Sequence, residues 1–292
     1  MKKKLLPAVF LLLMMGVSAM ANADDNNTVY GDVNGDGIVS SVDVTILYNI
    51  MLSGDEPGIT TYSVNGVEFK MVDVQGGTFN MGGTIEQGTD AAPNELPAHQ
   101  VTLSDFAIGQ TEVTQGLWLA VMGTRPSSHT GDLNMPVESV TWSECQTFIT
   151  KLNQFTGQNF RLLTEAEWEY AARGGKKSKG YKYSGSNNVD EVAWYKTTAT
   201  DHKTHIVAQK TPNELGLYDM SGNVDEWVYD YFSYGDTYPS EPQTNPTGPS
   251  SGSEHIYRGG NYYSTAYQCR VSYRNSWNYS KQDLGFRIAM SK

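Results

Sequence analysis

An acidic loop at residues 32–43 has the side chains and the spacing of a calcium site. Oxygen-bearing side chains occupy alternate positions before Gly37, and a further acid closes the segment. Calcium takes six or more hard oxygen ligands, and alternate residues of a tight turn direct their oxygens inward. In the spacing of an EF-hand loop, Gly37 permits the sharp bend and the seventh position offers its backbone carbonyl. A metal-free turn is the alternative, but we predict calcium ligands at Asp32, Asn34, Asp36, Ile38 and Asp43.

The two cysteines, Cys145 and Cys269, supply the thiols of the chain. Cys145 shares helical spacing with three apolar residues that follow it, Phe148, Ile149 and Leu152. It is therefore expected to be a small buried apolar side chain. A disulfide between the two cysteines is the alternative, which an oxidising compartment would permit.

Aromatic and arginine side chains lie on both sides of Cys269 in the sequence. Flat amphipathic rings with arginines between them can bind an extended peptide or a glycan by stacking and hydrogen bonding. The alternative is that most of these rings fill the interior of a fold with few strands. As candidate ligand-binding residues we take Tyr262, Tyr263, Tyr267, Arg270 and Trp277.

Residues 1–23 have the pattern of a secretory signal peptide. Three lysines precede an apolar run that is short for a membrane span and ends in a small-x-small pattern. The acidic residues that follow Ala23 disfavour a retained membrane anchor. We expect cleavage after Ala23, export to the periplasm or the extracellular space, and no membrane span in the mature chain.

The composition narrows the class of partner. The chain carries 32 acidic and 21 basic residues, a formal net charge of −11. Binding of nucleic acid needs clustered lysine and arginine, so this balance argues against a nucleic-acid partner. The 29 glycines and 18 tyrosines predict a loop-rich fold in which aromatic side chains fill much of the core.

Short strands and capped helices are expected to position these groups. Residues 67–72 alternate apolar and polar side chains, which is typical of a half-buried strand. Thr141 with Glu144, and Thr164 with Glu167, have the spacing of a capping box, so a helix is predicted to begin after each threonine.

Residues 31–52 resemble a single dockerin repeat, a calcium loop followed by one helix with an apolar face. Dockerins that bind cohesin modules carry two repeats, and this sequence shows one. One loop and one helix cannot bury an apolar face alone, so the helix is expected to pack on another part of the chain or on a partner. The resemblance implies calcium and a possible cohesin-like partner. It places a dockerin-like region at residues 24–56 and a linker at residues 57–63.

Six further segments resemble the formylglycine-generating enzymes, also called sulfatase-modifying factors. The resemblance covers nearly all of residues 64–292, which we assign to one domain of this family. It implies an α+β fold that is irregular and loop-rich and is related to C-type lectins. The matching segments are GGTFNMGG at 76–83, HQVTLSDFAIGQTEVT at 99–114, RLLTEAEWEYAARGG at 161–175, NELGLYDMSGNVDEW at 213–227, RGGNYYSTAYQCR at 258–270 and DLGFRIA at 283–289.

The same resemblance defines the chemistry to look for. Catalytic members oxidise a sulfatase cysteine to formylglycine with copper held between two cysteines five residues apart. This chain has Ser264 at the first position and Cys269 at the second. Two thiolates suit Cu(I), whereas a serine hydroxyl is a hard donor that keeps its proton near neutral pH. We therefore expect no copper and no oxidase chemistry, and a module that binds or scaffolds a peptide or glycan.

Two alternatives stay open at this point. The chain can be a true formylglycine-generating oxidase in which Cys269 finds an unexpected second ligand. It can also be a component of a polysaccharide-degrading or cell-surface assembly that is recruited through the dockerin-like repeat.

The resemblance also implies a structural calcium in the segment 213–227. It assigns the metal to Asn223 and Glu226 with nearby backbone carbonyls, and a turn capped by Asn223 without an ion is the alternative. Asp225 stands where the family usually has tryptophan, which puts an extra acid and one aromatic ring fewer beside this segment.

Overall fold

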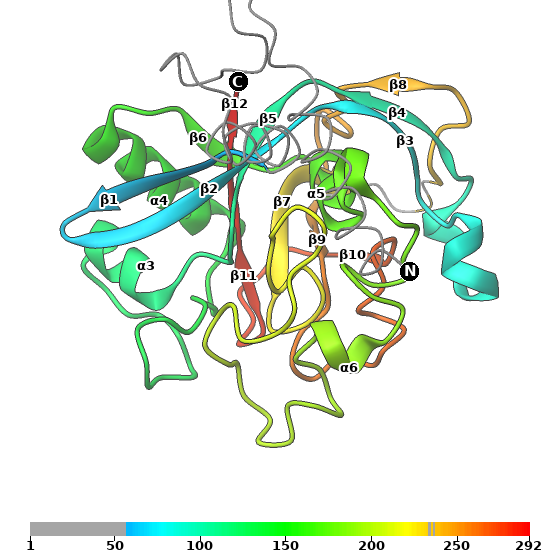
Figure 1. The fold of residues 1–292 in the computed structure, drawn as a ribbon. Coiled ribbons are helices and arrows are strands. Elements are labelled where there is room, and N and C mark those ends of the chain that lie inside the picture. Colours follow the sequence, from blue (N-terminus) through cyan, green and yellow to red (C-terminus); the bar gives the residue numbers. More distant parts are fainter. Residues whose placement is uncertain (1–56, 233–234, 236) are drawn as a thin grey trace, which may run out of the picture. The chain divides into compact units, whose positions relative to one another are not determined.

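The computed structural model describes residues 57–292 except 233, 234 and 236. The signal peptide, the calcium loop and the dockerin-like helix lie outside the described residues, so they stay predictions. The described part is a mixed α+β, loop-rich domain, which confirms the fold class (Figure 1). Within it, none of the helices is long and apolar enough to cross a membrane.

Twelve strands form three small sheets in the described residues. The first sheet has the order β1-β2-β5-β12-β6, with bounds Ile59–Val64, Val67–Val74, Phe106–Gly109, Ile288–Ser291 and Phe160–Leu162. The second has the order β10-β9-β7-β11, with bounds Arg274–Trp277, Glu254–Arg258, Asp225–Phe232 and Leu284–Phe286. The third has the order β3-β4-β8, with bounds Gly77–Met81, His99–Leu103 and Gln243–Thr244.

Four α-helices lie around these sheets, and three 3-10 turns join the described elements. The α-helices are α3 (Gln115–Met122), α4 (Trp142–Thr156), α5 (Glu165–Ala172) and α6 (Val189–Val192). The 3-10 turns are η2 (Ile85–Asp90), η3 (Pro93–Glu95) and η4 (Gly175–Lys177). The helices α3 and α4 lie beside β1 and β2, whereas α5 lies beside β7 and β3 (Figure 1).

Both predicted capping boxes are confirmed. Thr141 accepts a hydrogen bond from the Glu144 amide, and the Glu144 carboxylate accepts one from the Thr141 amide at 2.8 Å. Thr164 and Glu167 repeat the arrangement at the start of α5. Each pair satisfies two backbone donors that a helix start otherwise leaves open, which fixes where α4 and α5 begin.

The predicted linker at 57–63 is wrong for most of its length. Residues 59–63 belong to β1, which pairs with β2 from Ile59–Val72 to Val64–Val67. Tyr62 explains the difference, because its ring packs on Phe69 and Phe160 at 5.6 and 5.2 Å between centroids. The strand is therefore held by cross-strand pairing and by aromatic packing on β2 and β6.

The C-terminal segment passes from one sheet to another. The family-like segment at residues 283–289 is divided at Arg287 into β11 and the start of β12. β11 pairs with β7 in the second sheet, and β12 pairs with β5 and β6 in the first. The fully buried guanidinium of Arg287 donates to both carboxylate oxygens of Glu226 and to the carbonyls of Gly109 and Tyr218, so an ion pair holds the crossing point.

Aromatic side chains fill much of the core, as the composition predicts. Trp118 stacks on Phe148 with centroids 5.3 Å apart, and Phe286 meets both rings edge-on. Trp168 and Trp227 are fully buried. Rings of this size let a domain with short strands bury enough apolar surface to fold.

Candidate functional site

The loop after β9 carries Ser264, at the altered cysteine position, and its Gly260 packs on Cys269. Gly259 and Gly260 both have positive φ, at 99° and 73°. A Cβ at position 260 would lie 3.0 Å from the Cys269 sulfur and 2.9 Å from the Gln268 carbonyl. The backbone at Gly260 therefore packs directly on Cys269, where a side chain has no room.

Cys269 is a fully buried thiol. It packs in an apolar cluster with Tyr183, Val192 and Ala193. Burial raises the pKa of the Cys269 thiol, so the neutral form dominates at physiological pH. Cys145 is buried in a different cluster, on the inner face of α4 as predicted, and both cysteines are free thiols. The alternative of a disulfide between them is therefore wrong.

Ser264 does not replace the missing sulfur. Its hydroxyl accepts a hydrogen bond from the Asn261 amide at 3.0 Å, and the side chain is buried. Copper would need at least two soft donors here, and the donors present are one protonated thiol and one engaged hydroxyl. The site therefore does not fit Cu(I) in this arrangement.

An acidic pair lies next to this site. The side-chain nitrogen of Asn261, Nδ2, donates to the carboxylate of Asp225 at 2.7 Å and to that of Asp283 at 3.2 Å. Burial, and then the neighbouring Asp283, raise the pKa of Asp225 to about 8, so Asp225 is protonated at pH 7. Sequence analysis noticed that an acid had replaced tryptophan at this position but did not pair it with Asp283, because 58 residues of chain separate them.

The candidate ligand-binding residues divide into exposed and buried ones. Tyr263 is 57% exposed, Tyr267 39% and Trp277 37%, and Tyr279 nearby is 65% exposed. Lys281 holds its ammonium 4.5 Å from the Trp277 ring. Tyr262, by contrast, is buried, and its ring meets His129 edge-on at 5.0 Å. The exposed rings are available to a ligand, and Tyr262 is not.

The assignment of Arg270 to ligand binding is wrong. The side chain is fully buried, and its two terminal nitrogens donate to the two oxygens of Glu95 at 2.8 and 2.6 Å. Ser272 donates to the same carboxylate at 2.5 Å. The pair joins η3 to the segment that follows Cys269 and is structural. Sequence analysis missed it because Glu95 lies 175 residues away.

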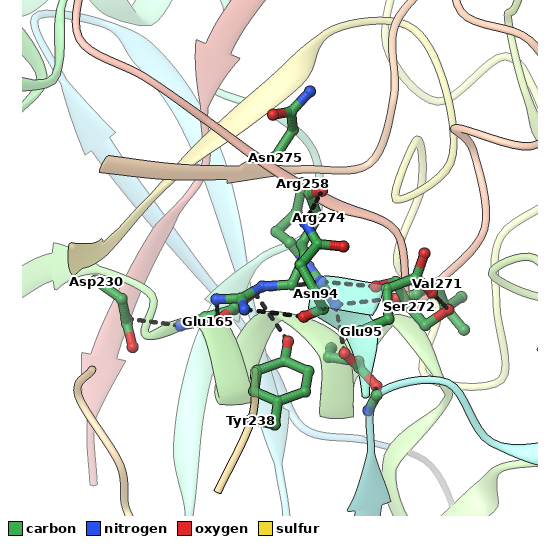
Figure 2. Close-up of polar contacts among 12 residues, drawn as sticks. Asn94, Glu95, Glu165, Asp230, Tyr238, Arg258, Val271, Ser272, Arg274 and Asn275 are labelled. Carbon is green, nitrogen blue, oxygen red and sulfur yellow. Dashed lines mark hydrogen bonds and ion pairs between the residues drawn. The ribbon is translucent and has the colours of Figure 1, made fainter. Parts of the chain in front are cut away.

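A second group of buried ion pairs lies beneath β9 and β10 (Figure 2). Glu165, at the start of α5, receives two hydrogen bonds from Arg274, both at 2.7 Å, and one from Arg258 at 3.3 Å. Arg258 also pairs with Glu169 one turn further along the helix. Tyr238 donates to Glu165 at 3.1 Å. These contacts tie α5 to the second sheet and leave neither arginine free to bind an anion.

Asn223 and Glu226, the residues assigned to structural calcium, are engaged with protein groups. The side chain of Asn223 accepts a hydrogen bond from the His205 backbone amide at 2.9 Å and donates one to the Glu112 carboxylate at 2.8 Å. Both Glu226 oxygens accept hydrogen bonds from Arg287, and one also accepts from Trp168 at 2.8 Å. Calcium would have to displace these contacts, so its role here stays a prediction. Across residues 57–292, where placement is described, no group of three acidic, histidine or cysteine side chains could hold a metal ion.

Comparison with known proteins matches two family models. The model described as "Sulfatase-modifying factor enzyme 1-like domain" matches residues 62–292. The model described as "Dockerin type I domain" matches residues 30–76. The second match ends inside the described domain, since its last residues form β1 and β2.

Similar proteins match over most of their length. "Chaperone protein LppX" of Paenibacillus barcinonensis is 34% identical, with 80% of this chain and 95% of that protein covered. "Formylglycine-generating enzyme" of Streptomyces coelicolor is 31% identical, with 75% and 88% covered. Among solved structures, "Treponema denticola variable protein 1" is 34% identical at a TM-score of 0.69, over 81% of this chain and all of that one. PvdO from Pseudomonas aeruginosa is 26% identical at a TM-score of 0.70, and the match covers 81% of this chain and 99% of that one.

Proposed function

We propose, from the premise that this chain belongs to the sulfatase-modifying factor family, that it is an exported module of that family without copper oxidase chemistry. It binds or scaffolds an extended peptide or a glycan. The observation that carries the proposal is that Cys269 is a fully buried thiol, while the other position of the family's cysteine pair holds a hydrogen-bonded serine. One soft donor binds Cu(I) weakly, because the ion favours two thiolates.

The binding role rests on the exposed rings between residues 263 and 279. These rings leave one-third to two-thirds of their surface exposed, and exposed aromatic rings are enriched among the residues that dominate binding surfaces. The Paenibacillus relative is named a chaperone. That name supports an extended polypeptide as one class of ligand, and the glycan remains the second class.

The first experiment tests the loss of oxidase chemistry. The purified protein is incubated with Cu(I), oxygen and a peptide that contains the motif Cys-x-Pro-x-Arg, and the peptide is examined by mass spectrometry. We expect the cysteine to stay intact. Conversion to formylglycine at an enzymatic rate, abolished by Cys269→Ala, would instead support the rival assignment as a formylglycine-generating oxidase.

The second experiment tests binding through the exposed rings. Fluorescence anisotropy follows a labelled extended peptide, and glycan-array binding follows the other class of ligand. Trp277→Ala is expected to weaken binding by at least about fivefold, since anchoring rings contribute more than about 1 kcal/mol. Phe155→Ala on α4 is the matched control, because Phe155 is also an exposed ring, 55% accessible. Equal effects of the two substitutions would reject the assignment of this surface.

A second role, recruitment into a larger assembly, is favoured by the match of a dockerin model to residues 30–76. Calcium bound by Asp32, Asn34 and Asp36 would order the loop, and the helix after it would present its apolar face to a cohesin-like module. Pull-down by an immobilised cohesin in millimolar calcium, lost on addition of chelator, tests this role. Failure to bind any tested cohesin at that calcium concentration would count against it.

A further inference from the structure

A cavity of about 470 Å³ lies beside the first turn of α5, and neither Ser264 nor Cys269 lines it. Its inner side is formed by Glu165, Asp230 and Arg274. Its outer side is formed by the segment 243–249 that includes β8. Because the cavity is lined by different residues from the exposed rings of the proposed function, it is an independent candidate for ligand binding.

The charges at this cavity cancel. Arg274 donates from Nε and Nη2 to the two oxygens of Glu165, both at 2.7 Å. Arg258 and Tyr238 complete the shell around the same carboxylate. An anionic ligand would therefore find no free guanidinium, and a cationic ligand would find no free carboxylate at Glu165. Burial of a charged ligand without a partner is costly, which disfavours both classes.

Two further titratable groups at the cavity, Asp230 and His99, are neutral at pH 7. Asp230 accepts the Glu165 amide hydrogen at Oδ2, at 2.8 Å (Figure 2). Burial, and then the nearby Glu165, raise the pKa of Asp230 to about 8, so it is a neutral acid at pH 7 that can both donate and accept. Burial lowers the pKa of His99, and its Nδ1 has no hydrogen-bond partner among the described residues.

The walls of the cavity are preformed. Asn245 exchanges hydrogen bonds with the Ser104 amide and hydroxyl at 2.9 and 3.0 Å, and its own amide donates to the Thr102 carbonyl. Gly248, at φ 71°, approaches Asp230 so closely that a Cβ would lie 2.9 Å from Oδ1. A wall held in this way needs little ordering when a ligand binds, which favours affinity.

We propose that this cavity binds a neutral sugar residue of a glycan. The ligand's hydroxyls would pair with Asp230, Gln243 and Thr247, and its apolar face would lie on the rings of Tyr231 or Phe232, all of which line the cavity. A sugar hydroxyl donates and accepts, as the neutral acid does, and a hexose presents carbon-bound hydrogens that suit an aromatic face. A ligand of this chemistry matches a polar cavity without net charge.

The test is titration calorimetry of the full chain, with the signal peptide removed, at pH 7. The probes are glucose, galactose, mannose, N-acetylglucosamine and cellobiose, with glucuronic acid and glucosamine as charged analogues. A hexose with ordinary ligand efficiency gives a Kd on the order of 1 mM. We expect at least one neutral sugar to bind in this range and both charged analogues to bind at least about tenfold more weakly.

Substitutions locate the binding. Thr247 lines the cavity and is exposed, so Thr247→Trp fills the opening without disturbing the core and is expected to weaken binding at least about tenfold. Thr150→Trp, at an exposed position of α4 outside the lining, is the matched control. Phe155→Ala, at an exposed ring of α4 outside the lining, should also leave the sugar affinity unchanged. Failure of the proposed function is recognised separately, as peptide or glycan-array binding that does not respond to Trp277→Ala.

A measurement that needs no variant complements the titration. The assigned ring signals of His99 should shift on addition of the bound sugar, because His99 lines the cavity. The inference is overturned by any of three results. These are no neutral sugar binding at tens of millimolar, charged analogues binding as well as neutral ones, or binding that is indifferent to Thr247→Trp and leaves His99 unshifted.

Discussion

Asp230 makes a quantitative prediction about stability and pH. The residue is 4% exposed, and its carboxyl is protonated in the folded protein up to a pKa of about 8, against an ordinary value of 3.8. Between these two values the folded state binds one proton more than the unfolded state does. The free energy of unfolding therefore falls as pH rises through this window, and the fall ends above about pH 8.

The size of the effect follows from the shift. Each pKa unit corresponds to about 1.4 kcal/mol, so the loss between pH 5 and pH 7 is roughly 3 kcal/mol for this group alone. Asp230→Asn removes the titration and keeps an oxygen that can accept the Glu165 amide hydrogen. The stability of the variant relative to the wild type should therefore rise by about 3 kcal/mol from pH 5 to pH 7 and level off above pH 8.

Urea unfolding followed by circular dichroism at pH 5, 6, 7 and 8 measures this difference. Asp132→Asn is the control, because it makes the same chemical substitution at an exposed position. It should show a nearly constant difference from the wild type. A constant difference for Asp230→Asn as well would mean that Asp230 ionises normally in the folded state, and the reasoning about its burial would be refuted.

Three other outcomes are expected. Arg270→Met should lower the free energy of unfolding by roughly 3–5 kcal/mol, measured by urea unfolding, because it leaves the carboxylate of Glu95 buried and unpaired. The double variant Arg270→Met/Glu95→Met should recover part of that loss, and no recovery would show that packing rather than charge is responsible. Ser264→Cys should raise Cu(I) affinity, measured by competition with a chromogenic chelator, because it adds a second soft donor near Cys269. Unchanged affinity would mean that the two positions cannot share an ion. Asp32→Ala and Asp36→Ala should each abolish calcium uptake by the N-terminal loop in titration calorimetry, and retained uptake would move the site elsewhere.

The features that the sequence predicted well depend on residues close together in the chain. Thr141 and Glu144 form a capping box because a helix start leaves amides that a nearby side chain can satisfy. Cys145 is buried because helical spacing places it beside Phe148 and Ile149. In both cases the interacting residues lie within one or two helical turns of each other. Their spacing in the sequence is therefore enough to predict the contact.

The features that the sequence does not predict depend on contacts between residues that are far apart in the chain. The aromatic neighbours of Arg270 in the sequence predict a ligand-binding group, but its partner Glu95 is supplied by η3, 175 residues earlier. Asp225 and Asp283 meet only because β7 and β11 are neighbours. Most of the linker predicted at 57–63 is a strand, because β2 and β6 supply aromatic partners for Tyr62 from distant parts of the chain.

The buried arginines hold the fold through contacts that do not involve positions 264 and 269. Arg258, Arg270 and Arg287 are each fully buried, and each is paired with a glutamate from a distant segment. Breaking one such pair costs several kcal/mol, whereas exchanging a sulfur for an oxygen at Ser264 alters one small side chain that still finds a hydrogen bond. The stability that these ion pairs supply therefore does not depend on which residues stand at positions 264 and 269. A member of the family can lose a donor, keep every element in place, and retain the surfaces on which a binding function depends.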